Sequence, residues 1–292
     1  MGLEISRPDK VLFPDDDITK LEFVQYYADV ADAMLPFAKG HPVAMLRMPN
    51  GIDGQRFFQK QAPDYFPDFI PRVEIPKSKG TTTYPICDSA KAIVYVASQA
   101  CIEFHLLPTL ADKLGRTDRM VFDFDPSIDD FDGVKRGAHM LKELLDELGL
   151  PSYVMTSGSR GLHVWVPLKD TPMDETHDFV NGVADVLVKR APDLLTTEFM
   201  KEARGDRIYF DVGRNRPAQH AVAPYSTRAK RGAPVATPLD WDELDDKKLD
   251  PQSYNLRNVR ERIKGTDPWR DMRRHAKSLG AAAKALAGLT GS

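Results

Sequence analysis

The chain has 292 residues, of which 42% are hydrophobic and 28% charged, and this is enough for one large or two modest buried cores. With 40 Lys and Arg against 43 Asp and Glu, the net charge of -3 excludes a uniformly basic nucleic-acid binder, so any such binding must be local. Cys87 and Cys101 lack a CxxC spacing and indicate neither a disulfide framework nor a zinc site, and without a signal peptide or a membrane-length apolar run we expect a soluble, cytoplasmic protein.

Hydrophobic periodicity predicts helices and short strands along the chain. Apolar residues at helical spacing, with Thr19 in the N-cap region and Gly40 just past the end, indicate a helix over residues 18–38. Further helices are predicted over residues 88–99, 129–148 and 175–189. Strands are predicted over residues 42–48, around Phe57 and Phe58, and over residues 72–75, 102–106, 153–156, 162–167 and 207–211.

The order of these elements favours a mixed α/β or α+β sheet domain over a helical bundle. A polar stretch at residues 110–118 separates a β-rich N-terminal part from one in which helices and strands alternate. Residues 279–292 are rich in Ala and Gly, and we expect a frayed helix or a disordered tail there.

The string VFDFDP at residues 121–126 predicts an apolar strand that carries two carboxylates. Alternate residues of a strand point to one face, so Asp123 and Asp125 lie side by side. Because burying an unpartnered carboxylate is costly, and because oxygen ligands suit Mg²⁺ or Mn²⁺, we predict a metal site with Asp211 as third ligand. The alternative is that Asp125, which precedes a proline, only caps the following loop.

The string SGSRGLH at residues 157–163 predicts a tight turn that enters a strand. Its glycines let the backbone approach a phosphate, and Ser157, Arg160 and His163 can donate hydrogen bonds to one. A hairpin loop without a ligand would have the same composition, and the string is neither a Walker A motif nor a dinucleotide fingerprint.

Basic side chains are in excess over residues 201–231, whereas acidic ones dominate residues 118–132. An acidic cluster facing a basic segment suits a metal-dependent site for a polyanion, although a charge run is more often a solvated face. Arg228 is a candidate phosphate ligand, because a guanidinium can bind phosphate in a bidentate way.

The pair Phe57 and Phe58 offers two interpretations. In a half-buried strand one ring faces inward and the other outward, and an exposed ring could stack on an unpaired base. Alternatively, both rings are buried between layers of the lobe. His105 likewise has an interpretation without a ligand, as a core histidine whose hydrogen bonds are satisfied within the protein.

Several strings, in order, resemble the polymerase domain of bacterial ligase D, a member of the archaeo-eukaryotic primase superfamily. They are DKVLFP (9–14), GTTTYP (80–85), FDFDP (122–126), SGSRGLH (157–163) and APYSTR (223–228), and the resemblance runs from about residue 7 to 262. It implies an α+β fold with a primase-like core of mixed β-sheets flanked by helices and a β-rich N-terminal lobe. A single domain is expected over residues 1–275, its lobes dividing near residues 112 and 113, with a tail over residues 276–292.

The resemblance implies a template-dependent nucleotidyltransferase that prefers ribonucleotides and uses two Mn²⁺ or Mg²⁺ ions. Such an enzyme fills short gaps or joins broken ends, in non-homologous end joining or short-gap excision repair. Expected partners are gapped or broken duplex DNA with a 5′-phosphate and NTP or dNTP, with Ku and a separate DNA ligase as candidate protein partners, in the bacterial nucleoid. The alternatives are a non-catalytic DNA-end bridging module and a metal-dependent nuclease.

Site residues are carried over by position. The metal triad matches Asp123, Asp125 and Asp211. The nucleotide contacts match Ser157, Arg160, His163, His105 and Arg228, to which we add Lys201 and Arg204 from the basic segment. Lys10 and Lys20 match the lysines that hold a 5′-phosphate, and Arg47, Phe57, Phe58 and Lys60 match residues around the template. Residues 80–85 fall in a mobile loop that organises DNA ends.

Three positions depart from the family's pattern. Arg160 stands where relatives often have Lys, residues 212–215 read VGRN rather than W-x-Q-N, and His105 is not followed by Pro-Trp. The Lys-x-Asp-Gly motif of the ligase does not occur in the sequence, and we therefore expect a stand-alone or excised polymerase.

Overall fold

The computed structural model describes residues 2–290, which form two compact units. Unit 1 contains the residues up to Leu114 together with His220–Thr237 and Gln252–Asp267. Unit 2 contains Gly115–Gln219, Pro238–Pro251 and the residues from Pro268 onward. The first change of unit lies close to the expected lobe boundary, but the chain then re-enters unit 1 twice, which no composition change in the sequence indicates.

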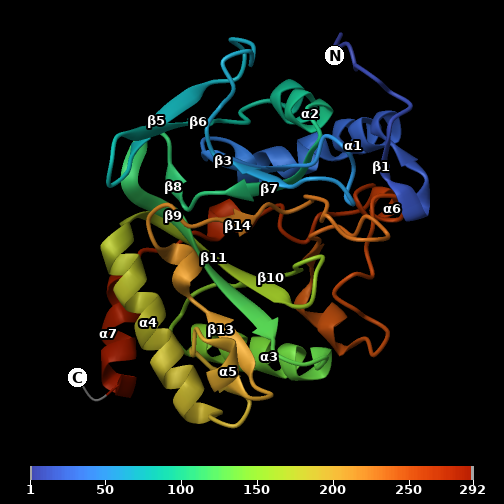
Figure 1. The fold of residues 1–292 in the computed structure, drawn as a ribbon. Coiled ribbons are helices and arrows are strands. Elements are labelled where there is room, and N and C mark those ends of the chain that lie inside the picture. Colours follow the sequence, from blue (N-terminus) through green and yellow to red (C-terminus); the bar gives the residue numbers. More distant parts are fainter. Residues whose placement is uncertain (1, 291–292) are drawn as a thin grey trace. The chain divides into compact units, whose positions relative to one another are not determined.

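Unit 1 is built on an antiparallel sheet with the strand order β14-β7-β3-β4 and two helices that pack together, α1 and α2 (Figure 1). Its strands are β3 (Val43–Arg47), β4 (Phe57–Gln59), β7 (Cys101–Leu106) and β14 (Ala221–Val222), and the helices are α1 (Lys20–Ala38) and α2 (Ala90–Ser98). Thr19 accepts a hydrogen bond from the Glu22 backbone N–H at 3.2 Å and caps α1, as predicted.

Two tyrosines of α1 hold a segment from much later in the chain. The Tyr26 hydroxyl donates to the Tyr225 carbonyl at 2.7 Å, and the Tyr27 hydroxyl lies 3.1 Å from the Thr227 hydroxyl. Burial raises the pKa of both phenols above its usual value. Residues 225–227 are therefore fixed inside unit 1.

The remaining elements of unit 1 are short. They are the hairpin of β1 (Val11–Phe13) and β2 (Ile18–Thr19), the hairpin of β5 (Arg72–Pro76) and β6 (Thr81–Pro85), strand β8 (Thr109–Leu110), helix α6 (Val259–Arg262) and the 3₁₀ helix η1 (Pro14–Asp16). Most of residues 80–85, expected as a loop, thus forms strand β6, which is in register with β5 from Thr81 opposite Pro76 to Pro85 opposite Arg72.

Unit 2 is built on a mixed sheet with the strand order β12-β13-β9-β11-β10-β15. Strands β12 and β13 are parallel to each other, and the other neighbours in this order are antiparallel. Its strands are β9 (Lys113–Pro126), β10 (Tyr153–Thr156), β11 (Leu162–Pro172), β12 (Leu195–Thr196), β13 (Ile208–Asp211) and β15 (Pro238–Leu239). Its helices are α3 (Phe131–Glu147), α4 (Met173–Arg190), α5 (Lys201–Arg204) and α7 (Gly280–Thr290), with the 3₁₀ helices η2 (Gly213–Asn215), η3 (Trp241–Asp245) and η4 (Met272–His275). The predicted α+β class is confirmed.

The alternation of β9 sorts aromatic and acidic side chains to opposite faces of the sheet. Phe122 and Phe124 pack against Phe210 of β13 with ring centroids 5.5 and 4.7 Å apart. Helix α3 covers this face at Gly137, where an added Cβ would lie 3.1 Å from the Phe124 ring. Asp123 and Asp125 consequently lie on the other face.

The Ala- and Gly-rich end of the chain is ordered as helix α7 through Thr290. Its Ala282 and Leu286 are buried, and Leu286 lies against Gly182 of α4. The expected tail is therefore packed, because the missing side chain of Gly182 leaves room for Leu286.

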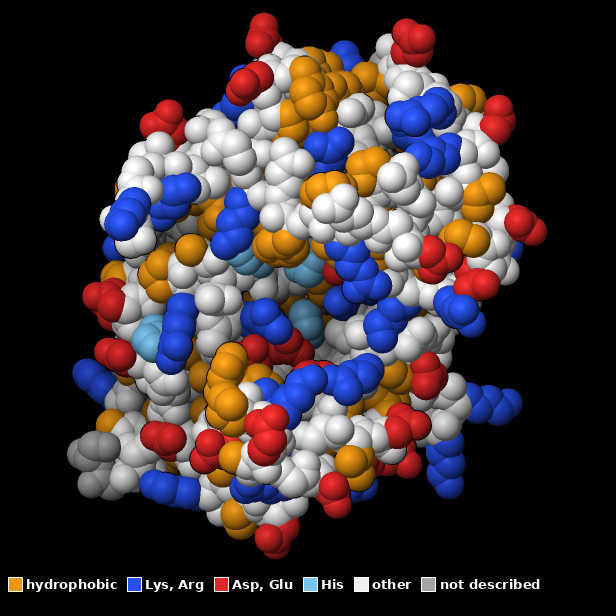
Figure 2. All heavy atoms as spheres, viewed as in Figure 1, with side chains coloured by type: hydrophobic (Ala, Val, Ile, Leu, Met, Phe, Trp, Pro, Cys, Tyr) orange, Lys and Arg blue, Asp and Glu red, His pale blue; other side chains and the backbone are white. Residues whose placement is uncertain are grey.

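Positive and negative side chains are interspersed over the face in Figure 2, in keeping with the small net charge. Over residues 2–290 no helix is both long and apolar enough to span a bilayer.

Candidate active site

Three predicted site residues lie in one row across the sheet of unit 2. Asp123 at the centre of β9 is in register with Asp211 of β13 on one side and with His163 of β11 on the other. Directly opposed residues of antiparallel strands share a face, so these three side chains meet. Asp125 lies two residues further along β9, on the same face and opposite Tyr209.

Of the three carboxylates predicted to bind metal, that of Asp123 is the least exposed. Its side chain is 11% exposed and lies 3.3 Å from His163 Nε2 and 3.1 Å from Arg214 Nη2. Burial alone would raise the pKa of Asp123, but His163 and Arg214 outweigh burial and hold this pKa well below its usual range. Asp123 is therefore a stable anion in the folded protein.

Asp211 has the opposite electrostatic balance. Its carboxylate accepts from the Gly213 backbone N–H at 2.8 Å and lies 3.3 Å from Arg214 Nε. Burial and the neighbouring Asp123 raise the pKa of Asp211, and the attraction of Arg214 only partly opposes them. The two opposed carboxylates thus repel each other and favour a cation between them.

Arg214 supplies that cation, and its position depends on Asn215. The Asn215 amide accepts from the Val121 N–H at 2.8 Å and donates to the Val121 carbonyl at 2.7 Å, which ties the turn after β13 to β9. Arg214 consequently lies over Asp123 and Asp211 and binds both. The sequence did not indicate this role beyond placing Arg214 three residues after Asp211.

Asp125 is bound by Arg160, whose Nη2 lies 2.9 and 3.1 Å from the two carboxylate oxygens. The loop-capping alternative for Asp125 is wrong, because β9 continues to Pro126 and the following helix α3 is capped by Asp130. Arg160 thus contacts a predicted metal ligand, and its side chain is 48% exposed.

The three carboxylates fit a divalent cation by their chemistry, although their present geometry is not that of a formed site. Among residues 2–290 no group of three His, Cys, Asp or Glu side chains is arranged to hold a metal. Instead, guanidinium groups neutralise the carboxylates, with Arg214 between two of them and Arg160 on the third. An all-oxygen set of this kind suits Mg²⁺ or Mn²⁺.

These carboxylates line a cavity of about 530 Å³ in unit 2. Its other charged lining residues include Asp185, Lys201, Arg204, Arg214 and Arg216. Lys201 and Arg204, the predicted nucleotide contacts of the basic segment, thus line the same cavity as the predicted metal ligands. Phe199, which the sequence did not indicate, also lines this cavity and is 76% exposed.

Arg204, however, is already engaged within the protein. Its guanidinium donates to the carbonyls of Glu198 and Phe199 at 2.9 and 2.6 Å and lies 3.8 Å from the centre of the Tyr209 ring. The side chain is 6% exposed. Arg204 therefore fixes the loop that carries Phe199, and this contact competes with its predicted role as a phosphate ligand.

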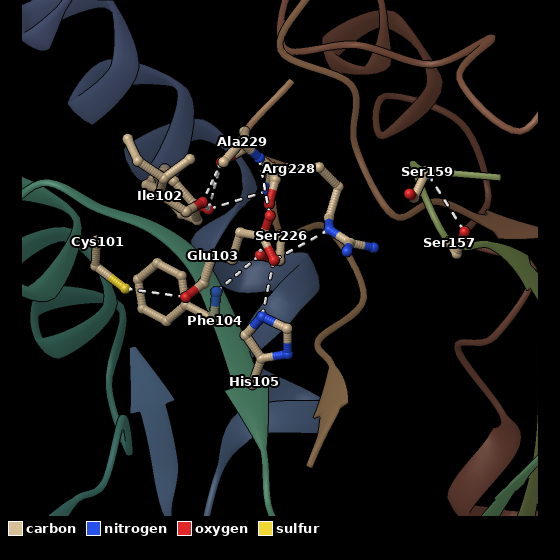
Figure 3. Close-up of polar contacts among 12 residues, drawn as sticks. Cys101, Ile102, Glu103, Phe104, His105, Ser157, Ser159, Ser226, Arg228 and Ala229 are labelled. Atoms are coloured by element: carbon tan, nitrogen blue, oxygen red, sulfur yellow. Dashed lines mark hydrogen bonds and ion pairs between the residues drawn. The ribbon is translucent and has the colours of Figure 1, made fainter. Parts of the chain in front are cut away.

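The turn at residues 157–161 is closed by its own side chain and backbone. Ser157 Oγ accepts from the N–H groups of Ser159 and Gly161, each at 3.2 Å, and the Ser159 contact is drawn in Figure 3. A Cβ at Gly161 would lie 1.7 Å from the Phe124 carbonyl oxygen. Packing against β9 thus accounts for this glycine without a ligand, whereas Gly158 is needed for its positive φ of 64°.

His105 and Arg228 meet in unit 1. Both contact the carboxylate of Glu103, at 2.8 Å from His105 Nε2 and 3.2 Å from Arg228 Nε (Figure 3). His105 is 16% and Arg228 18% exposed at the side chain. His105 is thus a partly exposed residue that contacts a carboxylate, and not a fully buried core histidine.

Both phenylalanines of β4 are exposed, Phe57 by 43% and Phe58 by 50%. The interpretation that both rings are buried is therefore wrong. The Phe58 ring lies edge-on to His105 and His220, with centroids 5.4 and 5.5 Å apart. Lys60 follows β4 and is half-buried.

A second, smaller cavity of about 100 Å³ gathers positive charge in unit 1. Its charged lining residues are Arg7, Lys10, Lys20 and Arg47, and none is acidic. Lys20 Nζ donates to the Ser6 carbonyl at 2.7 Å, and burial, together with Arg7 and Lys10, lowers its pKa. This cavity suits a small anion, and it groups Arg47 with the two lysines predicted to bind phosphate.

Comparison with known proteins identifies relatives over most of the chain. Residues 19–269 match the family model described as LigD, primase-polymerase domain. The multifunctional non-homologous end joining protein LigD of Mycolicibacterium smegmatis is 36% identical over 256 residues, 85% of this chain and 33% of that protein. The bifunctional LigD of Bacillus subtilis is 34% identical over 265 residues, 90% of this chain and 42% of that protein.

A solved structure also matches, the polymerase domain of Mycobacterium tuberculosis ligase D in complex with DNA. The TM-score is 0.89 at 32% sequence identity, and the match covers 94% of this chain and 99% of that one. The chain thus spans between a third and a half of the two curated relatives and nearly all of the solved domain.

Proposed function

The chain belongs to the LigD primase-polymerase domain family, and on that premise we propose that it is a template-dependent nucleotidyltransferase of DNA repair. It inserts nucleotides, preferably ribonucleotides, at short gaps or broken ends that carry a 5′-phosphate. The pathway is non-homologous end joining or short-gap excision repair, and Ku and a separate DNA ligase are the proposed protein partners.

The observation that carries the proposal is the opposition of Asp123 and Asp211, with Asp125 beside them, in the lining of one cavity. Two bound Mn²⁺ or Mg²⁺ ions would supply Lewis-acid chemistry here, activating the primer 3′-hydroxyl and offsetting charge on the triphosphate. We propose that Asp123 and Asp125 hold both ions and that Asp211 completes the catalytic one. With the ions bound, Arg214 and Arg160 would no longer be needed to neutralise the carboxylates and would be available to contact the phosphates.

Unit 1 supplies the other groups that the proposal requires. Lys10 and Lys20 bind the 5′-phosphate of the downstream strand in the small basic cavity. His105 and Arg228 bind phosphates of the incoming nucleotide. The exposed rings of Phe57 and Phe58 stack on bases of the template, because stacking tolerates any base.

The test is extension of a primer across a one-nucleotide gap, with and without the 5′-phosphate, in Mn²⁺ and with either ribo- or deoxyribonucleotides. We expect templated insertion, faster with ribonucleotides and stimulated by the phosphate, and none from the D123A/D125A double variant. Tight binding without insertion would instead support the bridging module. Shortening of the labelled strand without nucleotides would indicate a nuclease.

A further inference from the structure

We infer that Glu103 is the residue that positions both His105 and Arg228 for the incoming nucleotide. The inference rests on the proposed function, since it assigns the support of the nucleotide contacts in unit 1. Glu103 acts through its two neighbours and is therefore a positioning residue, and not one that contacts the nucleotide itself.

The carboxylate of Glu103 contacts three groups, which come from two separate segments of the chain (Figure 3). Its Oε2 lies 2.8 Å from His105 Nε2 and 3.2 Å from Arg228 Nε. Its Oε1 accepts from the backbone N–H of Ala229 at 2.9 Å. Because residues i and i+2 of a strand share a face, Glu103 and His105 of β7 lie together, and the carboxylate thus joins β7 to residues 228 and 229.

The backbone before Arg228 is fixed to the same strand. The Phe104 N–H donates to Ser226 Oγ at 2.9 Å, and the Ala223 N–H donates to the Phe104 carbonyl at 2.9 Å. Residues 223–227 are thus held along β7 without help from Glu103. What Glu103 adds is the direction of the Arg228 side chain, whose guanidinium nitrogens beyond Nε point away from Glu103 in Figure 3.

Exposure distinguishes the carboxylate from the groups that it holds. The Glu103 side chain is 8% exposed, whereas His105 and Arg228 each expose about twice that fraction, 16% and 18%. The anion therefore lies behind two groups that can reach a ligand. Burial would raise the pKa of Glu103, but the hydrogen bond of His105 and the charge of Arg228 lower it to about 2, so the carboxylate stays charged.

The charge of Glu103 also explains how two donors can lie side by side for one ligand. The buried carboxylate accepts from His105 Nε2 and pairs with the positive charge of Arg228, so one anion holds both groups in place. A polyphosphate then meets two donors whose directions are already set, which reduces the conformational entropy lost on binding. This is the chemistry expected for a nucleoside triphosphate.

The test is a kinetic comparison of Glu103→Gln with the wild-type protein during insertion of ATP opposite thymine at a phosphorylated gap. We expect KM for ATP to rise by about tenfold, with a smaller change in kcat and unchanged affinity for the gapped DNA. Glu147→Gln is the matched control, because it removes a different carboxylate–arginine pair. Glu147 Oε2 lies 2.8 Å from Arg190 Nη2, and neither residue belongs to the proposed nucleotide site. Its KM should equal that of the wild type.

A double-mutant cycle separates positioning from general stability. In the Arg228→Gln background, Glu103→Gln should cost less than it does alone, because the share of its effect that passes through Arg228 is already lost. Equal costs in both backgrounds, or an unchanged KM in the single variant, would overturn the inference. Should Glu103→Gln fail to fold, Glu103→Asp keeps the charge but withdraws the carboxylate by one methylene, and a wild-type KM in that variant would overturn it equally.

Failure of the proposed function gives a different result. If His105→Gln and Arg228→Gln both leave KM for ATP unchanged, these residues do not bind the nucleotide, and the assignment of the site itself is wrong. If those two variants raise KM and Glu103→Gln does not, the proposed function stands and only the role of Glu103 is rejected.

Discussion

Asp123 and Asp211 are directly opposed in the antiparallel pair of β9 and β13, and Arg214 contacts both carboxylates at 3.1 to 3.3 Å. One guanidinium thus occupies the position between two acids where the proposed reaction requires a divalent ion. The folded protein favours the charged form of Asp123 and disfavours that of Asp211, since the pKa of Asp123 is lowered and that of Asp211 is raised.

Because of this difference, Asp123→Asn and Asp211→Asn should both abolish nucleotide insertion but change stability in opposite directions. Asp123→Asn leaves Arg214 and His163 without their shared anion, and we expect a loss of roughly 3 kcal/mol. Asp211→Asn removes a repelled, buried charge and should stabilise the protein by about 1 kcal/mol. Urea denaturation in EDTA measures both, and equal destabilisation would contradict the assigned balance.

Arg214→Gln should bind Mn²⁺ more tightly than the wild type when no nucleotide is present. The metal no longer competes with a guanidinium for two carboxylates, and we expect a gain in affinity on the order of tenfold. Isothermal titration calorimetry checks this without relying on activity. Arg190→Gln, which removes an exposed arginine paired with Glu147, is the control and should leave the affinity for Mn²⁺ unchanged.

Lys10→Ala and Lys20→Ala should each reduce the preference for a gap with a 5′-phosphate. Both ammonium groups line the small basic cavity, and loss of one phosphate contact should lower affinity on the order of tenfold and reduce the salt slope by about one. Fluorescence anisotropy with phosphorylated and unphosphorylated gaps measures the difference. Lys142→Ala, whose amine instead contacts Asp146, should leave the preference intact.

Glu103 predicts a pH dependence of stability. Its folded pKa of about 2 lies below its ordinary 4.5, so its stabilisation is present above about pH 4.5 and is lost as the pH falls toward 2. The shift corresponds to about 3 kcal/mol. The difference in unfolding free energy between wild type and Glu103→Gln should therefore shrink between about pH 6 and about pH 2.5, and a constant difference would contradict this.

Gly161→Ala should be severely destabilising. An added Cβ would lie 1.7 Å from the Phe124 carbonyl oxygen, so β9 and the turn at residues 157–161 must separate. We expect a cost of roughly 3 kcal/mol or more. Gly280→Ala is the matched control, because nothing lies within 4 Å of its Cβ, and thermal denaturation of both variants provides the measurement.

Much of the fold could be predicted from the sequence because its periodicities are strong. The stripe in residues 18–38 predicts α1, and the alternation in residues 121–126 predicts the end of β9. The carboxylate pair was found in the same way. The first half of β9 was missed, because residues 113–118 belong to a polar stretch that indicates a boundary between lobes. The hairpin partner β6 was missed, since its residues Thr81–Pro85 lack an apolar alternation and gain their order from pairing with β5.

What the sequence could not show depends on register between distant segments. The position of Arg214 over Asp123 follows from the pairing of β13 with β9 and from the clamp of Asn215. Likewise, the engagement of Arg204 by carbonyls of its own loop makes it different from a free basic side chain of the same segment. Such contacts are set by tertiary structure and leave no local signature.

The discontinuity of unit 1 has a consequence for synthesis on the ribosome. Until residues 221–227 emerge, β7 lacks the neighbour β14, and the hydroxyls of Tyr26 and Tyr27 lack their partners at residues 225 and 227. The nascent chain therefore carries an uncovered strand edge while about a hundred further residues are translated. We expect this interval to be the time at which a chaperone is most needed, and truncations that end between the two units to aggregate.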